Sequence, residues 1–155
     1  MGAGVFVLGL AIGGGILTWQ CWQRRNAPFV CPVPKKYCYR GKQVQLRDGS
    51  PAIGFQVPVG TRVQAGISGL ASQGAYKRPD GKIEQSLQIE TESGRKLYYA
   101  FVGKSLVQMQ VVASGQPIGE IEDEGEAVKK TGANLVVYFR DQDGQIKPLS
   151  AKDFR

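Results

Sequence analysis

Two cysteines, Cys31 and Cys38, are the residues of this 155-residue chain whose type and spacing most directly suggest chemistry. They bracket a short stretch with two prolines and two lysines, and this spacing allows either a small disulfide loop in an oxidising compartment or two free thiols. The chain has no histidine, which excludes a Ser-His-Asp triad, a Cys-His pair and any histidine-ligated zinc site. Two cysteines alone make a poor zinc site, so we expect neither a metal nor a cofactor.

Two acidic motifs are weaker candidates for a cation-binding site. Asp141 and Asp143 precede Gly144 like the beginning of a calcium loop, but no later acidic ligand follows at the required spacing, so we interpret them as a turn. Five further acids could attract cations or a basic partner, although a solvated loop accounts for them without such a role: Glu120, Glu122, Asp123, Glu124 and Glu126. The sequence contains no glycine-rich phosphate loop before a helix and no nucleophile paired with a base. We therefore expect a protein that is not an enzyme.

The net charge of +7 is concentrated near the N-terminus. Residues 48–155 contain 13 basic and 13 acidic side chains. Residues 1–47 contain no acid and seven basic side chains: Arg24, Arg25, Lys35, Lys36, Arg40, Lys42 and Arg47. The remainder of the chain is therefore neutral, and its surface gives no reason to expect nucleic acid.

The basic segment also contains Phe29, Tyr37 and Tyr39, which could stack on nucleic-acid bases. Lipid head groups are nearer anions beside a membrane segment, and they attract each basic residue by up to about 1 kcal/mol. We therefore expect anionic lipid as the partner and nucleic acid as the weaker alternative. Four residues are predicted to contact the head groups: Arg24, Arg25, Lys35 and Lys36.

Residues 2–22 carry no charge, and as a helix they would span about 30 Å, the thickness of a hydrocarbon core. They predict one transmembrane helix over residues 1–23, because a cleaved signal peptide, the alternative, would need a basic beginning that is missing here. Trp19 and Trp22 end the apolar run where an interfacial aromatic belt would lie. Gly9 and Gly13 form a GxxxG pair, which would let a helix of another membrane protein or of a second copy pack closely in lipid.

Residues 24–42 predict a basic linker, because Pro28, Pro32 and Pro34 interrupt them and they sustain no periodicity. Residues 43–155 predict one β domain. Turn signals such as Asp80-Gly81 and Asp143-Gly144 separate short runs rich in β-branched and aromatic residues.

The runs alternate as strands do. Leu87 and Ile89 share one strand face, and Leu97, Tyr99 and Phe101 share a face of the next run. Residues 120–130 alone are free enough of turn signals to allow a short helix or a mobile loop. The pattern predicts a mostly β, antiparallel domain of seven to nine short strands, in the sandwich or barrel class.

Four motifs stand out in this domain: VPVGTRVQAGISG at residues 57–69, LYYAF at 97–101, VVASGQPIG at 111–119 and TGANLVVYFR at 131–140. In this order and spacing they resemble the PxGTxVxAxxxG, LYAH, VxxGQxIG and TGPHLHFEVR motifs of lysostaphin-like (LytM-type) zinc endopeptidases, which cut peptidoglycan cross-bridges. The third motif also occurs in lipoyl-like and other barrel-sandwich domains. The resemblance covers about residues 50–150 and implies an antiparallel sandwich of the LytM-peptidase type.

In that family an HxxxD pair and an HxH pair converge on one zinc ion, and a further histidine assists the activated water. The resemblance places these functional positions on five residues of this chain: Ser50, Gly54, Phe101, Asn134 and Val136. None of the five has an imidazole or a carboxylate, so the resemblance implies the fold without the catalyst. It also implies that these residues and Tyr99 lie on one surface, where a vestigial groove is either filled by the protein's own side chains or open to a peptide or subunit.

We therefore expect a non-catalytic, membrane-anchored pseudopeptidase that acts as a binding, scaffolding or regulatory subunit of an envelope or membrane complex. The alternatives are a β-barrel or lipoyl-like adaptor module and a cell-wall endopeptidase with atypical ligands. The positive-inside rule would place the domain in the cytoplasm, since basic residues follow the apolar segment. Because the resembled enzymes act on the wall and paired cysteines favour an oxidising compartment, we expect it outside the cytoplasm.

Overall fold

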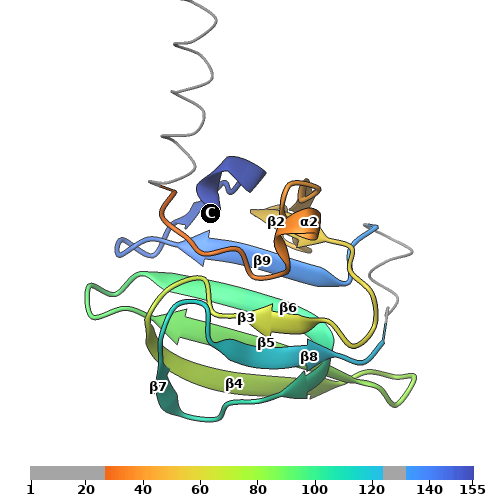
Figure 1. The fold of residues 1–155 in the computed structure, drawn as a ribbon. Helices are drawn as coiled ribbons and strands as arrows, with labels where there is room; N and C mark the ends of the chain where they lie inside the picture. The colour runs from red at the N-terminus through yellow and green to blue at the C-terminus, as the bar shows by residue number, and fades with distance from the viewer. Residues whose placement is uncertain (1–26, 124–131) are drawn as a thin grey trace, which may run out of the picture.

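The computed structural model describes residues 27–123 and 132–155 of the chain (Figure 1). Within these two ranges, no helix is long and apolar enough to cross a bilayer. The transmembrane helix predicted over residues 1–23 lies outside the described residues, together with Gly9, Gly13, Arg24 and Arg25.

The described residues form ten β-strands, one short α-helix and one 3-10 helix. The helices are α2 (Lys35–Cys38) and η1 (Ala151–Asp153). The strands are β1 (Lys42–Gln45), β2 (Pro51–Phe55), β3 (Arg62–Gln64), β4 (Gly69–Lys77), β5 (Ile83–Glu90), β6 (Lys96–Ser105), β7 (Gln110–Val112), β8 (Pro117–Ile121), β9 (Leu135–Arg140) and β10 (Ile146–Lys147).

Seven strands lie side by side in the order β1-β2-β9-β6-β5-β4-β7. β10 pairs with β9, whereas β3 pairs with β8, which also pairs with the end of β6. Figure 1 shows β3 and β8 lying across one face of the main sheet. Every pairing between these strands is antiparallel, which confirms the mostly β, antiparallel class predicted from the sequence.

The core lies between the main sheet and the β3–β8 pair. Leu87 of β5 is opposite Tyr99 of β6, and Ile89 is opposite Leu97, and all four side chains are fully buried. Their strand neighbours point to the other face, as the period of two requires. The alternation found in the sequence is therefore confirmed for β5 and β6. Residues 120 and 121 belong to β8 rather than to the helix or loop expected from residue 120 onward.

The segment after residue 26 belongs to this core, so the expectation of a linker over residues 24–42 is corrected for its described part. Phe29, Cys31, Val33 and Cys38 are nearly inaccessible to solvent and pack in the same hydrophobic cluster as the strands. Phe29 contacts the ring of Phe154, at a centroid distance of 5.7 Å. Burial of this much apolar surface gives the segment a fixed position on the domain.

Backbone hydrogen bonds join this segment to the end of the chain. The Phe29 N–H donates to Asp153 O, and the Arg155 N–H donates back to Phe29 O at 2.9 Å. The Cys31 N–H donates to Arg155 O at 3.0 Å, and Arg155 Nη1 donates to Ala27 O at 2.6 Å. We call this contact between residues 27–31 and 153–155 the terminal clasp. It brings the first and last described residues to one end of the domain, beside β2 and α2 (Figure 1).

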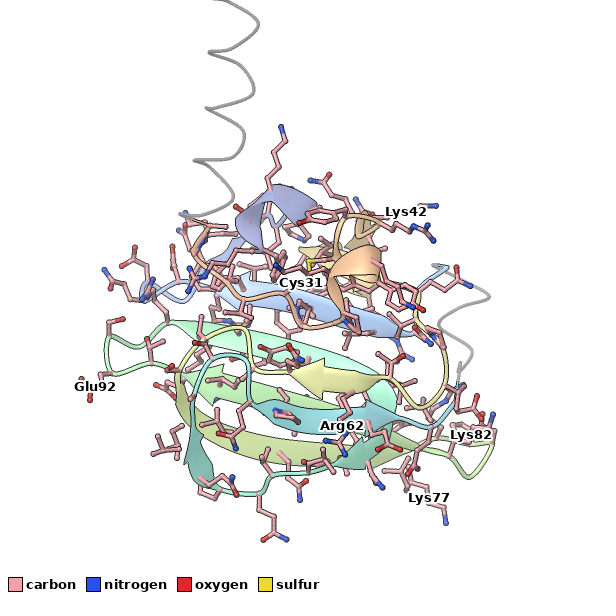
Figure 2. All side chains as sticks on the ribbon, in the orientation of Figure 1. Cys31, Lys42, Arg62, Lys77, Lys82 and Glu92 are labelled. Carbon is pink, nitrogen blue, oxygen red and sulfur yellow. A yellow bond between two sulfur atoms is a disulfide. The ribbon has the colours of Figure 1, made fainter. Side chains whose placement is uncertain are left out.

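A disulfide joins Cys31 to Cys38 and closes the turn that contains α2 (Figure 2). Of the two states that the sequence left open, the structure therefore contains the bonded one. The disulfide fixes the loop between its two cysteines and holds α2 against the clasp.

Replacing both Cys31 and Cys38 with serine is expected to lower the free energy of unfolding by about 2.5 kcal/mol, the loop-closure contribution of so short a loop. The measurement is urea unfolding of the full chain in detergent, followed by near-ultraviolet circular dichroism. The matched control is Cys21→Ser, which leaves the disulfide intact and should unfold like the parent. Equal unfolding midpoints for all three proteins would show that the disulfide contributes nothing to stability.

Candidate functional site

The main sheet has an outer face, defined here as the face turned away from β3 and β8. Gly54 of β2 is opposite Val136 of β9, and Val136 is opposite Ala100 of β6. Side chains paired in register point to the same side of a sheet. These three positions therefore form one row across three neighbouring strands of the outer face.

Gly54, at the position of the resembled family's aspartate ligand, has no room for a side chain. A Cβ added there would lie 2.6 Å from the Cβ of Ala133 and 3.1 Å from Cγ1 of Val44. Real Cβ atoms do not approach other carbon atoms this closely, so even alanine would require the neighbours to move. The packing therefore leaves no room for the carboxylate that the resemblance would require at this position.

Asn134, at one of the two histidine positions, uses its amide inside the protein. Its Oδ1 accepts a hydrogen bond from the Val57 N–H at 2.9 Å, and its Nδ2 donates to the Val57 carbonyl at 2.7 Å. The side chain is 4% exposed, and its backbone N–H donates to Phe55 O. Asn134 therefore fastens the segment after β2 to the beginning of β9. Both of its polar side-chain atoms have partners.

Ser50 lies away from this row, in the turn between β1 and β2. It precedes Gly54 by four residues of extended chain, a distance of about 13 Å along the strand. Its N–H donates to Oδ1 of Asp48 at 2.9 Å, and its carbonyl accepts from the Leu46 N–H. The structure thus brings Gly54, Asn134 and Val136 together, and it places Ser50 at the far end of β2.

Protonation of Asp48 is expected to release this turn. The hydrogen bond from the Ser50 N–H holds the pKa of Asp48 below its ordinary value of 3.8. A carboxyl with a lowered pKa stabilises the fold above that value, and the contribution is lost as the pH falls through the lowered pKa. The amide resonance of Ser50 should therefore shift with a midpoint below pH 3.8 in an NMR titration of the full chain in detergent micelles. A midpoint at or above that value would contradict the hydrogen bond.

The expectation that Tyr99 and Phe101 share a surface with Gly54 and Val136 is wrong. Phe101 is opposite Leu135 in the register, and both side chains point into the core. Phe101 packs so closely against Gly119 that a Cβ on this glycine would overlap the ring. The residue of β6 that faces Val136 is Ala100, one position earlier than the motif alignment indicates.

Tyr99 is also part of the core. Its side chain is fully buried, and its hydroxyl accepts a hydrogen bond from the Gly66 N–H at 2.7 Å. Burial raises the pKa of Tyr99 well above its ordinary range, so the phenol stays protonated. Tyr99 stabilises the segment after β3 and is not available to a partner.

The outer face instead has a pair of tyrosines that the sequence analysis missed. Tyr98 of β6 is opposite Tyr138 of β9, and their rings stack at a centroid distance of 4.5 Å and an interplanar angle of 4°. The guanidinium of Arg140 lies 5.8 Å from the centre of the Tyr98 ring. Both tyrosines are half-buried, and burial raises the pKa of Tyr138. We call Tyr98, Tyr138 and Arg140 the tyrosine platform.

Three of the acidic residues considered as metal ligands, Glu120, Asp123 and Asp141, have partners within the protein. Asp141 Oδ1 accepts from the N–H groups of Asp143 and Gln145, which is the geometry of a turn. Glu120 forms an ion pair with Lys104 at 4.0 Å. Residues 124 and 126 lie outside the described ranges. In residues 27–123 and 132–155, no three Cys, Asp or Glu side chains gather closely enough to hold a metal ion.

An open cavity of about 580 Å³ lies away from the tyrosine platform, at the end of the β4–β5 hairpin. Its lining includes Gln85, Gly103, Lys82 and Asp123. Gln85 Nε2 donates to Gly103 O at 3.1 Å, and Lys82 forms an ion pair with Asp123 at 2.5 Å. These four groups thus bind one another, and the hydroxyl of Ser105, which also lines the cavity, donates to Val107 O.

The outer face is therefore the candidate site. It contains a glycine with no room for a side chain and an asparagine whose amide is hydrogen-bonded within the protein, beside a half-buried pair of tyrosines. No protein-family model matches this chain, and no curated protein matches it.

Proposed function

We propose that this chain is a single-pass membrane protein whose β domain is a degenerate lysostaphin-like domain that binds a partner protein and does not cut peptidoglycan. The observation that carries the proposal is the packing of Gly54 against Ala133 and Val44. A carboxylate ligand cannot be accommodated there without moving two strands or their connection, and the neighbouring Asn134 already uses its amide on Val57. The motifs of the fold are retained while the ligand positions serve packing.

The tyrosine platform is the surface that we propose for binding. Stacked tyrosines present flat apolar area with little conformational freedom to lose, and tyrosine and arginine are enriched among residues that dominate protein interfaces. Nε of Arg140 is buried and, among the described residues, has no hydrogen-bond partner. The proposed partners are other membrane or envelope proteins.

We propose that the domain lies outside the cytoplasm. The Cys31–Cys38 disulfide supports this side, because disulfides persist in oxidising compartments and are rare in reducing ones. Cleavage by protease added to intact cells would support it. A domain that is cleaved only after the cells are opened would place it in the cytoplasm, as the positive-inside rule predicts.

The test of the binding function compares three forms of the full chain purified in mild detergent. The double substitution Tyr98→Ala and Tyr138→Ala should abolish co-purification of a protein that the parent retains. The matched control is Tyr76→Ala, which removes a tyrosine exposed on β4 and should retain the same protein. Retention of the partner by the platform variant would contradict the proposed surface.

The absence of catalysis is tested separately, with purified peptidoglycan and a zinc assay. We expect no hydrolysis and no stoichiometric zinc for the parent protein. Hydrolysis that depends on bound zinc and is lost in Asn134→Ala would overturn the proposal in favour of an endopeptidase with atypical ligands.

A further inference from the structure

The terminal clasp fixes how far the domain can lie from a membrane. Ala27 is buried, and its carbonyl accepts the hydrogen bond from Arg155 Nη1, so the chain is held in the domain from this residue onward. The apolar run of the sequence ends at Trp22. Only residues 23–26 separate Trp22 from Ala27, and four extended residues reach about 14 Å. If the run is an anchor, the clasp end of the domain lies next to the bilayer.

The excess positive charge of the described residues lies at this same end. Residues 27–50 and 139–155 contain nine basic and four acidic side chains, whereas residues 51–123 and 132–138 contain seven of each. The first group includes the terminal clasp, α2, β1 and η1, which surround β2 and β9 at one end of the strand order. Figure 2 shows Lys42 at this end, while Lys77 lies at the opposite end.

Seven of these basic residues are exposed and form no ion pair with a described carboxylate. One is Arg47, in the turn after β1, and the other six are Lys35, Lys36, Arg40, Lys42, Lys152 and Arg155. We call them the basic end. Lys35 and Lys36 belong to α2, and Lys42 is the first residue of β1. Arg40 lies between these two elements, and Lys152 and Arg155 lie among residues 152–155. Two of them are thus added by a segment distant in sequence, which the clasp brings beside the others.

We propose that the basic end rests on the anionic head groups of the membrane that anchors the chain. This inference rests on the membrane anchor of the proposed function. Attraction to an anionic surface extends about one Debye length, which is about 10 Å at 0.1 M salt, so only charges held close to the bilayer contribute. The short connection holds the basic end within that range, and the tether supplies a high effective concentration, so weak contacts are enough to orient the domain.

This contact sets the orientation of the whole domain. The strands are arranged away from the membrane in the order β1, β2, β9, β6, β5, β4, β7. The tyrosine platform, on β6 and β9, then lies at mid-height on a face roughly perpendicular to the bilayer. A partner would reach it from the side, parallel to the membrane plane.

The test uses the full chain with Cys21→Ser, reconstituted into phosphatidylcholine vesicles with or without phosphatidylglycerol. A fluorophore is attached at Gln43→Cys on β1 or, in a second protein, at Gln110→Cys on β7. Quenching by head-group spin-labelled lipid reports which label lies near the bilayer. We expect quenching of the β1 label in the anionic vesicles to exceed that of the β7 label at least twofold and to weaken in neutral vesicles.

Charge variants test the contact itself. Lys35→Gln, Lys42→Gln and Lys152→Gln together should reduce quenching of the β1 label in anionic vesicles to its value in neutral ones, since each basic residue near such a surface contributes up to about fivefold to binding. The matched control removes three basic residues elsewhere, by Arg62→Gln, Lys77→Gln and Arg95→Gln, and should leave quenching unchanged.

Failure of the membrane anchor and failure of the proposed orientation give different results. Protein released from the vesicles by alkaline carbonate would overturn the anchor and, with it, the orientation. Protein that resists carbonate but shows equal quenching of both labels, or no response to the lysine substitutions, would overturn the orientation alone.

Discussion

Replacing Gly54 with aspartate is expected to lower the free energy of unfolding by roughly 3–6 kcal/mol and to create no zinc site. The new side chain would overlap Ala133 and Val44, and forcing extra atoms into a packed region costs about 1–3 kcal/mol. The carboxylate would also lose hydration beside Ala133 and Val44, with the exposed Lys42 as its cross-strand neighbour, and this desolvation adds to the loss. Urea unfolding of the full chain in detergent measures the loss, and a zinc titration measures metal binding.

The matched control for this substitution is Gly74→Asp. Gly74 is exposed on β4, and a Cβ there would meet nothing closer than 3.7 Å. We expect this variant to unfold within about 1 kcal/mol of the parent. If Gly54→Asp were as stable as the control and bound zinc, the packing argument against a peptidase would fail.

Replacing Asn134 with leucine is expected to cost about 2–5 kcal/mol of stability. Leucine has a similar size but no polar atoms, so the N–H and the carbonyl of Val57 would both stay buried without partners. Each unpaired buried group costs about 1–3 kcal/mol. The same unfolding experiment measures the loss.

The variant Asn134→Asp tests whether the loss of stability comes from the missing hydrogen bonds or from the altered shape of the side chain. Its carboxylate can still accept from the Val57 N–H but repels the Val57 carbonyl, whereas its protonated form can donate to that carbonyl. This carboxyl is harder to ionise in the folded state than in the unfolded state, so the variant should recover stability as the pH falls from about 7 toward 4. A pH-independent defect, or none, would contradict the two hydrogen bonds.

The strands were predictable because their signals are local. Alternation in β5 and β6 depends on neighbours in sequence, and the turn at Gly94 depends on a residue that tolerates its φ of 83°. The hydrogen bond from the Thr91 N–H to Arg95 O closes the hairpin there. Such features need no knowledge of distant segments.

The site was only partly predictable, because a motif alignment does not reveal strand register. Gly54 and Val136 meet as the resemblance implies, yet the alignment of Phe101 is one residue off, and one residue reverses the face of a strand. The alternation already grouped Phe101 with Leu97 and Tyr99, and this signal was the stronger one. The stacking of Tyr98 on Tyr138 required the pairing of β6 with β9, forty residues apart.

Residues 27–42 were misjudged for the same reason. Their prolines and charges resemble a linker, and the partners that bury Phe29 include Phe154, which is 125 residues further along the chain. No local sequence pattern predicts a contact between residues so far apart in the chain. The two cysteines were the only local hint that this segment had a fixed conformation.

The terminal clasp also determines the order in which the protein can mature during its synthesis. The N-terminal half of the clasp leaves the ribosome first, and at about 5–20 residues per second it waits on the order of ten seconds for residues 153–155. β2 must likewise wait for β9, its partner across more than eighty residues. During this interval the Cys31–Cys38 loop, whose closure requires only seven residues, can form by itself. We therefore expect a nascent chain whose disulfide forms before the domain folds, with exposed strand edges that a chaperone would recognise until β9 and residues 153–155 have been made.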